Sequence, residues 1–241
     1  MSSSRTTNSG PRKERIIVAL DQEDLAAAQR LVKSLSGLIS FFKVGSELFS
    51  AAGPDAVRMV RDGGAEVFLD LKYHDIPNTV SRAVRSAAGL GVSLVNVHTL
   101  GGVQMMRAAA DSAREVDPVT RVIGVTVLTS MDATDLLRVG IEDAPEEEVV
   151  RLARLAREAG LAGVVSSARE VVRLREEFGP GFILIAPGIR PAGADSGDQK
   201  RIVTPREAFE AGADYIVVGR PIAAAPDPRA AAESIIEEIG E

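Results

Sequence analysis

The chain of 241 residues contains no cysteine and no tryptophan, and only two histidines. The absence of cysteine excludes disulfide bonds, thiolate-ligated metal centres and a thiol nucleophile. Aromatic residues make up only 4 % of the chain, which leaves few rings on which nucleic-acid bases could stack. Acidic residues outnumber basic ones by 34 to 28, so the chain has no overall positive field to gather nucleic acid or anionic lipid. We therefore expect an anionic ligand to be bound by a local basic site.

Long hydrophobic runs are also missing. No stretch of about 18 apolar residues is free of charge, so we expect no membrane span. Residues 1–15 are rich in Ser, Thr and Arg and lack the apolar core of a secretory signal, which predicts a disordered N-terminal tail. The composition of the whole chain, 45 % hydrophobic and 26 % charged, is typical of a globular protein with a large core. We expect a cytoplasmic protein.

From residue 16 onward, short apolar runs rich in β-branched residues alternate with segments of helical periodicity. The predicted strands are residues 16–21, 41–44, 66–72, 94–98, 121–128, 163–166, 182–186 and 215–218. Helices are predicted at 24–35, 77–90, 103–115, 146–159, 168–178 and 227–239. Eight such units without a break in composition favour one α/β domain over residues 16–241, a single (β/α)8 TIM barrel.

An open, doubly wound sheet is the alternative architecture for the same alternation of strands and helices. A dinucleotide-binding sheet of that kind would carry Gly-x-Gly-x-x-Gly after its first strand, where glycines allow the pyrophosphate to approach the backbone. No such motif follows residues 16–21. The barrel is therefore the favoured prediction.

Charged residues stand at the ends of the first three predicted strands. Because alternate residues of a strand share a face, Asp70 and Lys72 lie on the same face as Phe68. If the aliphatic residues between them meet the helices, both charged side chains point into the barrel near its C-terminal rim, where barrel active sites lie. The same alternation turns Asp21 and Lys43 inward.

Isolated charges are costly to bury, so these side chains are expected to pair with one another. One interpretation is a structural cluster of ion pairs that closes the barrel. The other is a functional site, because functional sites are where such costly arrangements persist. Three charged strand ends in succession favour the functional site.

Residues 70–79, Asp-Leu-Lys-Tyr-His-Asp-Ile-Pro-Asn-Thr, resemble the signature of the bacterial orotidine 5'-monophosphate decarboxylase family, Asp-x-Lys-x-x-Asp followed by Ile-Pro-x-Thr. Further matching positions follow in the order of the family, and the resemblance extends over roughly residues 16–235. These positions are Asp21, Lys43, Leu128–Ser130, Ala186–Arg190, Gln199 and Val218–Arg220. The resemblance implies an enzyme that converts the small nucleotide orotidine 5'-monophosphate (OMP) to UMP and CO2 in pyrimidine biosynthesis, without a cofactor or a metal.

The resemblance also implies the catalytic groups. Lys72 would stabilise the negative charge that develops at C6 of the pyrimidine and then protonate that carbon. An ammonium close to this charge contributes on the order of 4 kcal/mol at an effective dielectric near 20. Asp70, together with Asp75 of the partner subunit, would flank Lys72, and Lys43 and Asp21 would extend the array of alternating charges.

In the family, Asp75 reaches the active site across a homodimer interface, together with Ile76 and Thr79. The same residues can also begin a helix, because Asp is a good N-cap and Pro77 is tolerated in a first turn. Both interpretations can hold at once.

Substrate contacts are implied at further positions. Asp21 and Lys43 would bind ribose hydroxyls. Thr129 and Ser130 would meet the pyrimidine, with Thr129 favoured by its position in the family pattern and with capping of a following helix as the alternative for Ser130. The phosphate would lie after the seventh and eighth strands, where barrels often bind phosphate, and the loop Pro191–Lys200 is a candidate lid. The full implied set is Asp21, Lys43, Asp70, Ile76, Thr79, Thr129, Ser130, Pro187, Arg190, Gln199, Gly219 and Arg220.

The main rival is a sister enzyme on the same barrel that shares Asp-x-Lys-x-x-Asp and uses magnesium to act on sugar phosphates. In that branch a carboxylate on the second strand helps to bind the metal, and here the position is Lys43, which repels a cation. A catalytically silent barrel would be expected to lose Lys72 or its flanking aspartates. His74 and His98 are not needed for the implied mechanism; His98 is expected in the core and His74 in a loop.

Overall fold

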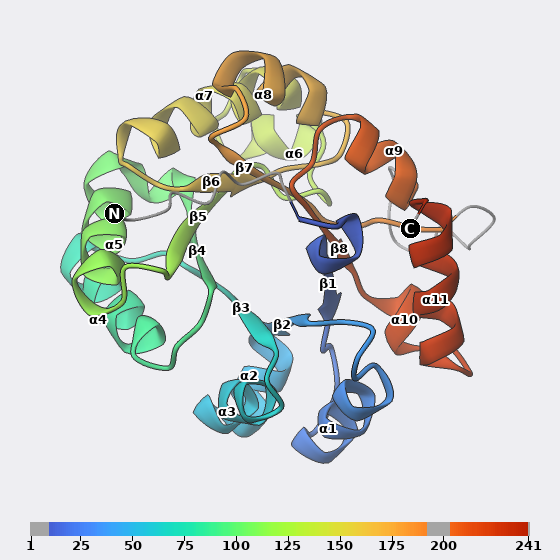
Figure 1. Ribbon diagram of the computed structural model, residues 1–241. Coiled ribbons are helices and arrows are strands. Elements are labelled where there is room, and N and C mark those ends of the chain that lie inside the picture. Colours follow the sequence, from blue (N-terminus) through green and yellow to red (C-terminus); the bar gives the residue numbers. More distant parts are fainter. Residues whose placement is uncertain (1–9, 192–202, 241) are drawn as a thin grey trace, which may run out of the picture.

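The computed structural model describes residues 10–191 and 203–240, and their strands form one closed parallel barrel in the order β1-β2-β3-β4-β5-β6-β7-β8. The helices surround the barrel on its outside (Figure 1). This architecture confirms the predicted (β/α)8 barrel. The open-sheet alternative is excluded because β1 pairs with β8.

The observed strands match the predicted runs within a few residues. They are β1 (Ile16–Ala19), β2 (Phe41–Gly45), β3 (Glu66–Tyr73), β4 (Leu94–His98), β5 (Arg121–Val125), β6 (Gly163–Val165), β7 (Ile183–Ala186) and β8 (Tyr215–Val218). The predicted first and fifth strands run past the ends of β1 and β5. The apolar pattern continues into these loops because they still pack at the barrel rim, where Leu20 is buried.

The predicted helices are also present, with ends shifted by up to three residues. They are α1 (Leu25–Ser34), α4 (Pro77–Ala88), α5 (Gly102–Val116), α7 (Pro145–Glu158), α8 (Val171–Phe178) and α11 (Pro228–Glu238). The other α-helices of the described part are α2 (Ser46–Ala52), α3 (Pro54–Asp62), α6 (Ala133–Arg138), α9 (Pro205–Glu210) and α10 (Arg220–Ala223). The start of α1 is set by Asp24, whose side chain accepts a hydrogen bond from the Ala27 N–H at 2.7 Å.

The core has two layers that follow the alternation of the strands. Val67 and Leu69 of β3 pack outward with the helices, whereas Phe68 lies inside the barrel with Ile17 and Ala19 of β1. This partition confirms the predicted facing of these strands. The inward-facing positions further along β3, Asp70 and Lys72, therefore lie toward the C-terminal opening of the barrel.

A short 3-10 helix, η1 (Arg12–Arg15), precedes β1. The Arg12 guanidinium donates to the Ile239 carbonyl at 3.0 Å, and that of Arg15 lies 4.9 Å from the centre of the Phe209 ring. A folded segment therefore connects the start of β1 to the C-terminal helices, so the predicted disorder is wrong for Arg12–Arg15. The rest of the predicted tail, residues 1–9, lies outside the described residues.

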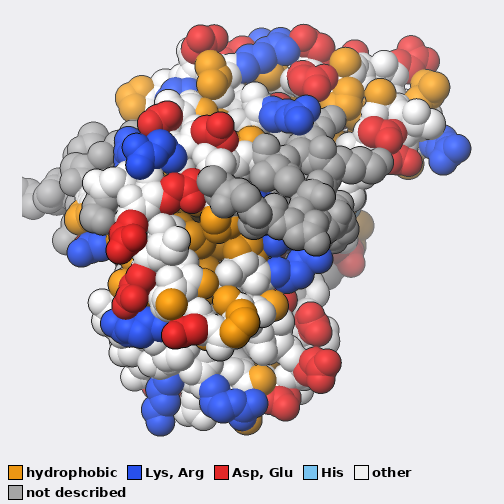
Figure 2. Space-filling view, turned by 90° about the vertical axis from the view of Figure 1, so that its right-hand side faces the viewer, with side chains coloured by type: hydrophobic (Ala, Val, Ile, Leu, Met, Phe, Trp, Pro, Cys, Tyr) orange, Lys and Arg blue, Asp and Glu red, His pale blue; other side chains and the backbone are white. Residues whose placement is uncertain are grey.

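The surface carries charges of both signs. Figure 2 shows lysine, arginine and acidic side chains interspersed on one face of the molecule. None of the helices in the described ranges is long and apolar enough to cross a membrane. The visible face thus agrees with the expectation that binding of an anion depends on a local basic site.

Candidate active site

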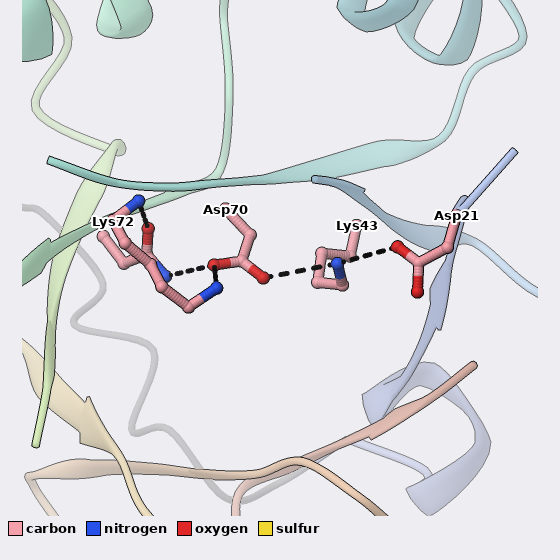
Figure 3. A network of polar contacts seen from close by, with 5 residues as sticks. Asp21, Lys43, Asp70 and Lys72 are labelled. Carbon is pink, nitrogen blue, oxygen red and sulfur yellow. Dashed lines mark hydrogen bonds and ion pairs between the residues drawn. The ribbon is translucent and has the colours of Figure 1, made fainter. Parts of the chain in front are cut away.

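Four charged side chains from neighbouring strands form one line across the mouth of the barrel (Figure 3). Lys43 Nζ lies 3.1 Å from Asp21 Oδ1 and 3.3 Å from Asp70 Oδ2. Lys72 Nζ lies 2.6 Å from Asp70 Oδ1. The order Asp21–Lys43–Asp70–Lys72 alternates in sign, so the structure brings together the four residues that the strand ends predicted.

The two inner groups of this line are stabilised in their charged forms. Burial lowers the pKa of Lys43, but the attraction of Asp70 and Asp21 outweighs burial and leaves this pKa raised. Burial likewise raises the pKa of Asp70, yet Lys43, Lys72 and the hydrogen bonds from Lys72 and Asn96 leave it lowered. Both residues are therefore ionised at neutral pH, and the line carries fixed charges.

The backbone is irregular where β3 presents its charged residues. β3 and β4 pair at Leu69 with Val95 and next at Tyr73 with Val97, so three residues of β3 stand opposite one residue of β4. Lys72 has φ 50°, the only positive φ of a non-glycine residue in the described ranges. Such a conformation costs of order 1–3 kcal/mol and occurs where surrounding contacts enforce it.

The residue opposite this bulge is Asn96, to which the sequence analysis assigned no role. Asn96 Oδ1 accepts a hydrogen bond from the Lys72 backbone N–H at 2.8 Å, and Asn96 Nδ2 donates to Asp70 Oδ1 at 2.6 Å. The signal in the sequence that could have identified Asn96 is a polar amide at an inward-facing position of an otherwise apolar strand.

A cavity of about 180 Å³ opens beside the charged line. Its apolar lining includes Phe68, Val125, Val165 and Val217. The remaining lining residues are Lys43, Asp70, Lys72, Asn96, Val127, Leu128, Thr129, Ser166 and Pro187. The cavity thus places charged groups and an apolar surface around one space, an arrangement suited to a flat polar ring with an ionised substituent.

The structure separates the two candidates after β5. Thr129 lines the cavity, whereas Ser130 is exposed and is not part of the lining. The alternative role of Ser130 as a helix cap is wrong, because the N-cap of α6 is Asp132, whose side chain accepts from Thr134 and Asp135. Pro187, predicted from the segment after β7, also lines the cavity.

The expected phosphate-binding groups follow β7 and β8, which are paired in the barrel. Arg190 is buried and its backbone N–H donates to the Val203 carbonyl at 3.2 Å. Gly219 is the N-cap of α10, and Arg220 is the first residue of that helix and is exposed. Gln199 and nearly all of the predicted lid lie outside the described residues.

Asp75, Ile76 and Thr79 lie where β3 leads into α4, and all three are exposed. The N-cap of α4 is Ile76, so Asp75 is not the cap; instead its Oδ1 accepts from the Ile76 N–H at 2.6 Å. The Ile76 side chain is 66 % exposed. Within the described ranges of this one chain, Asp75 forms no ion pair with Lys72.

The histidines form a pair beside the site, with ring centres 5.6 Å apart. His98 is partly buried at the end of β4, and burial, followed by electrostatic interaction with His74 and Lys72, lowers its pKa. His74 is exposed in the loop after β3. His98 is therefore neutral at neutral pH.

In barrel enzymes the active site lies at the C-terminal ends of the strands. This closed (β/α)8 barrel has its charged line and its cavity at that end, so its fold and site are those of the barrel enzymes. Within the described ranges, no three or more His, Asp or Glu side chains gather as a potential metal site. Residues 14–235 match the orotidine 5'-phosphate decarboxylase / HUMPS family, and the chain belongs to this family.

Named relatives cover almost the whole chain. The orotidine 5'-phosphate decarboxylase of Moorella thermoacetica is 56 % identical over 233 residues, which are 94 % of this chain and 92 % of that protein. The protein of the same name from Geobacter sulfurreducens is 52 % identical, with 94 % and 96 % covered. The crystal structure of orotidine 5'-phosphate decarboxylase from Lactobacillus acidophilus superposes with a TM-score of 0.84 at 39 % identity, covering 95 % of this chain and all of that one.

Proposed function

We propose that this protein is an orotidine 5'-phosphate decarboxylase, a carboxy-lyase of pyrimidine biosynthesis that converts OMP to UMP and CO2. The observation that carries the proposal is the line Asp21–Lys43–Asp70–Lys72 beside an apolar cavity, in a chain that belongs to this family. The line supplies fixed charges, and the cavity supplies a dry surface for the pyrimidine ring.

The reaction breaks the bond between C6 and its carboxylate, and the electron pair stays on C6 while CO2 leaves. The Lys72 ammonium stabilises this charge and then transfers one proton to C6, which yields UMP; solvent returns the proton to the lysine amine. Asp70, at 2.6 Å from Lys72 Nζ, holds the ammonium in place. Most of the lowering of the barrier is therefore electrostatic.

Lys43 and Asp21 extend the line toward the ribose, where an ammonium and a carboxylate can donate to and accept from hydroxyl groups. Thr129 and Pro187, which line the cavity, contact the pyrimidine. Arg190, Gln199, Gly219 and Arg220 bind the phosphate, with the two guanidinium groups offering paired donors. Binding energy from this remote phosphate holds the ring at Lys72.

The reaction needs neither a cofactor nor a metal. Lys43 occupies the position on the second strand at which the magnesium-dependent sister enzymes are expected to carry a carboxylate ligand. Its ammonium lies between the two neighbouring aspartates, at 3.1 and 3.3 Å, where it would repel a divalent cation.

The active unit is a homodimer in which Asp75, Ile76 and Thr79 complete the site of the partner subunit. All three residues are exposed at the start of α4, so they are accessible to a partner subunit. The catalytic domain spans residues 16–241, preceded by the short helix η1, and the enzyme acts in the cytoplasm.

The direct test follows the loss of ultraviolet absorbance of OMP with the purified protein in excess EDTA. Rapid conversion to UMP is expected, and Lys72→Ala should fold and dimerise but lose nearly all turnover. Conversion by Lys72→Ala at the wild-type rate would remove Lys72 from the mechanism. Activity only on a sugar phosphate, and only with magnesium, would assign the chain to the sister branch.

A further inference from the structure

Asn96 connects the two catalytic candidates of β3 through a single buried amide. Its residue exposure is 1 %, and both polar atoms of its side chain are hydrogen bonded, at 2.8 Å to the Lys72 backbone and at 2.6 Å to Asp70. Side-chain amides at such depth stay only where their hydrogen bonds are satisfied. The bonds of Asn96 are made to site residues on the neighbouring strand.

The bond to Lys72 compensates for the bulge in β3. In a regular ladder, a backbone N–H of β3 would donate to a carbonyl of β4, but here the pairing skips from Leu69 to Tyr73. The Asn96 side chain accepts the Lys72 N–H in place of a β4 carbonyl. It thereby supports the left-handed conformation of Lys72, φ 50°, from which the lysine side chain reaches back to Asp70.

The bond to Asp70 has a defined direction. A backbone N–H can only donate, so the oxygen of the amide must face Lys72 and its NH2 group must face Asp70. Asp70 Oδ1 then receives Asn96 and Lys72, and Oδ2 faces Lys43 at 3.3 Å. The carboxylate is thus held at one rotation, with one oxygen for each lysine.

We propose that Asn96 is a positioning residue for the decarboxylation, which orients the Asp70 carboxylate and the Lys72 backbone without touching the substrate's reacting atoms. This inference rests on the proposed function, and it adds a residue that the family signature in β3 does not contain. A loss of orientation of about 1 Å at a reacting group can cost roughly 100-fold in rate.

The first experiment compares Asn96→Ala with wild type in kcat and KM for OMP. We expect kcat to fall about 100-fold while KM changes by less than about 5-fold, because the phosphate and ribose contacts remain. Thr120→Val is the matched control: Thr120 is also buried and its hydroxyl donates to the Val92 carbonyl at 2.7 Å, but it lies at the opposite end of the barrel. The control should keep kcat within about 2-fold at a similar loss of stability. An Asn96→Ala enzyme with wild-type kcat would overturn the proposal.

Asn96→Asp separates positioning from mere packing. The carboxylate keeps the volume and the acceptor for Lys72, but replaces the donor with a negative charge facing Asp70, with Lys43, Lys72 and His98 as the other charged or titratable groups nearby. Protonation of the new group restores an O–H donor. The kcat of Asn96→Asp relative to wild type should therefore rise at least 10-fold as the pH is lowered, and a pH-independent ratio would contradict the proposal. Should Asn96→Ala not fold, this profile alone decides.

Exchange of the Lys72 backbone amide gives a measurement that does not depend on activity. We expect exchange at least 10-fold faster in Asn96→Ala than in wild type and unchanged exchange in Thr120→Val. If wild type decarboxylates OMP but the Asn96 variants match it, only this inference fails. If wild type does not decarboxylate OMP, the proposed function fails, and unchanged Lys72 exchange in Asn96→Ala would then overturn the role of Asn96 as well.

Discussion

At the scale of single residues, most buried polar groups of the site have hydrogen-bond partners, but one buried hydroxyl has none in the described part of the chain. Asp70 is bonded on both oxygens, by Asn96 and by two lysines. Ser166, on the wall of the same cavity, has a buried hydroxyl oxygen without a hydrogen-bond partner in the described part of the chain. A buried polar group of this kind costs about 1–3 kcal/mol unless a ligand satisfies it.

We expect Ser166→Ala to leave the free energy of unfolding unchanged or to raise it by up to about 1 kcal/mol, because no hydrogen bond is lost. Thr126→Val is the matched control, since the Thr126 hydroxyl is buried and donates to the Val165 carbonyl at 2.9 Å. That variant should lose about 1 kcal/mol. Chemical denaturation of both variants checks the contrast, and a loss above about 1 kcal/mol in Ser166→Ala would contradict it.

The lowered pKa of Asp70 predicts a dependence of stability on acid. Because the folded-state pKa lies below the ordinary 3.8, the carboxylate stabilises the fold fully above pH 3.8, and this contribution is lost as the pH falls through the folded-state pKa. One proton corresponds to a slope of at most about 1.4 kcal/mol per pH unit. In urea denaturation below pH 3.8, wild type should lose stability more steeply with acid than Asp70→Asn; parallel curves would disprove the linkage.

At the scale of elements, the N-terminal end of the barrel is held by Arg175 of α8. Its guanidinium donates to the carbonyls of Gly179, Phe182 and Gly212 at 2.5–3.1 Å and to Asp214 at 2.6 Å. The Asp214 side chain is fully buried, and burial raises its pKa despite Arg175 and the Leu184 N–H. One side chain thus joins the end of α8 to the starts of β7 and β8.

We expect Arg175→Lys to lower the free energy of unfolding by roughly 2–4 kcal/mol, since an ammonium cannot reproduce this planar set of donors beside a buried carboxylate. Arg154→Lys should cost much less than Arg175→Lys, because its paired contact with Glu177 involves an arginine side chain that is 60 % exposed. Denaturation of the two variants checks the difference. Both should keep wild-type kcat below their melting temperatures, as they lie away from the cavity, and equal stability losses would refute the assignment.

At the scale of the whole molecule, one barrel carries the charged line, whereas the proposed site also needs Asp75 of the partner subunit. This division predicts complementation between two inactive variants, Lys72→Ala and Asp75→Ala. A mixed dimer has one site with both substitutions and one site with none. Equal amounts that exchange subunits freely should regain about a quarter of wild-type activity, because half of the dimers are mixed.

Turnover after unfolding and refolding the mixture measures this recovery, with each variant refolded alone as the control. Mixtures that stay as inactive as their components would place Asp75 and Lys72 in the same subunit's site. Sedimentation of the same samples reports whether dimers formed.

Much of the fold and of the site could be predicted because it depends on local periodicity. The alternation of β3 placed Phe68 inside the barrel and aligned Asp70 with Lys72, and the structure agrees. Strand ends were predicted less well, as the loops after β1 and β5 keep an apolar pattern. The capping role weighed for Ser130 was wrong because Asp132, two residues later, already forms a capping box with Asp135.

The sequence by itself determined the barrel class, the inward line of charges and the family, because hydrophobic spacing and the residues of 70–79 are properties of the chain alone. Only the tertiary structure decided which groups form hydrogen bonds to the charged residues of that line. The bulge in β3, the left-handed Lys72 and its bond to Asn96 join residues 24 positions apart. Such a contact arises only when β3 and β4 pair in one register, and register depends on closure of the whole barrel rather than on any local pattern.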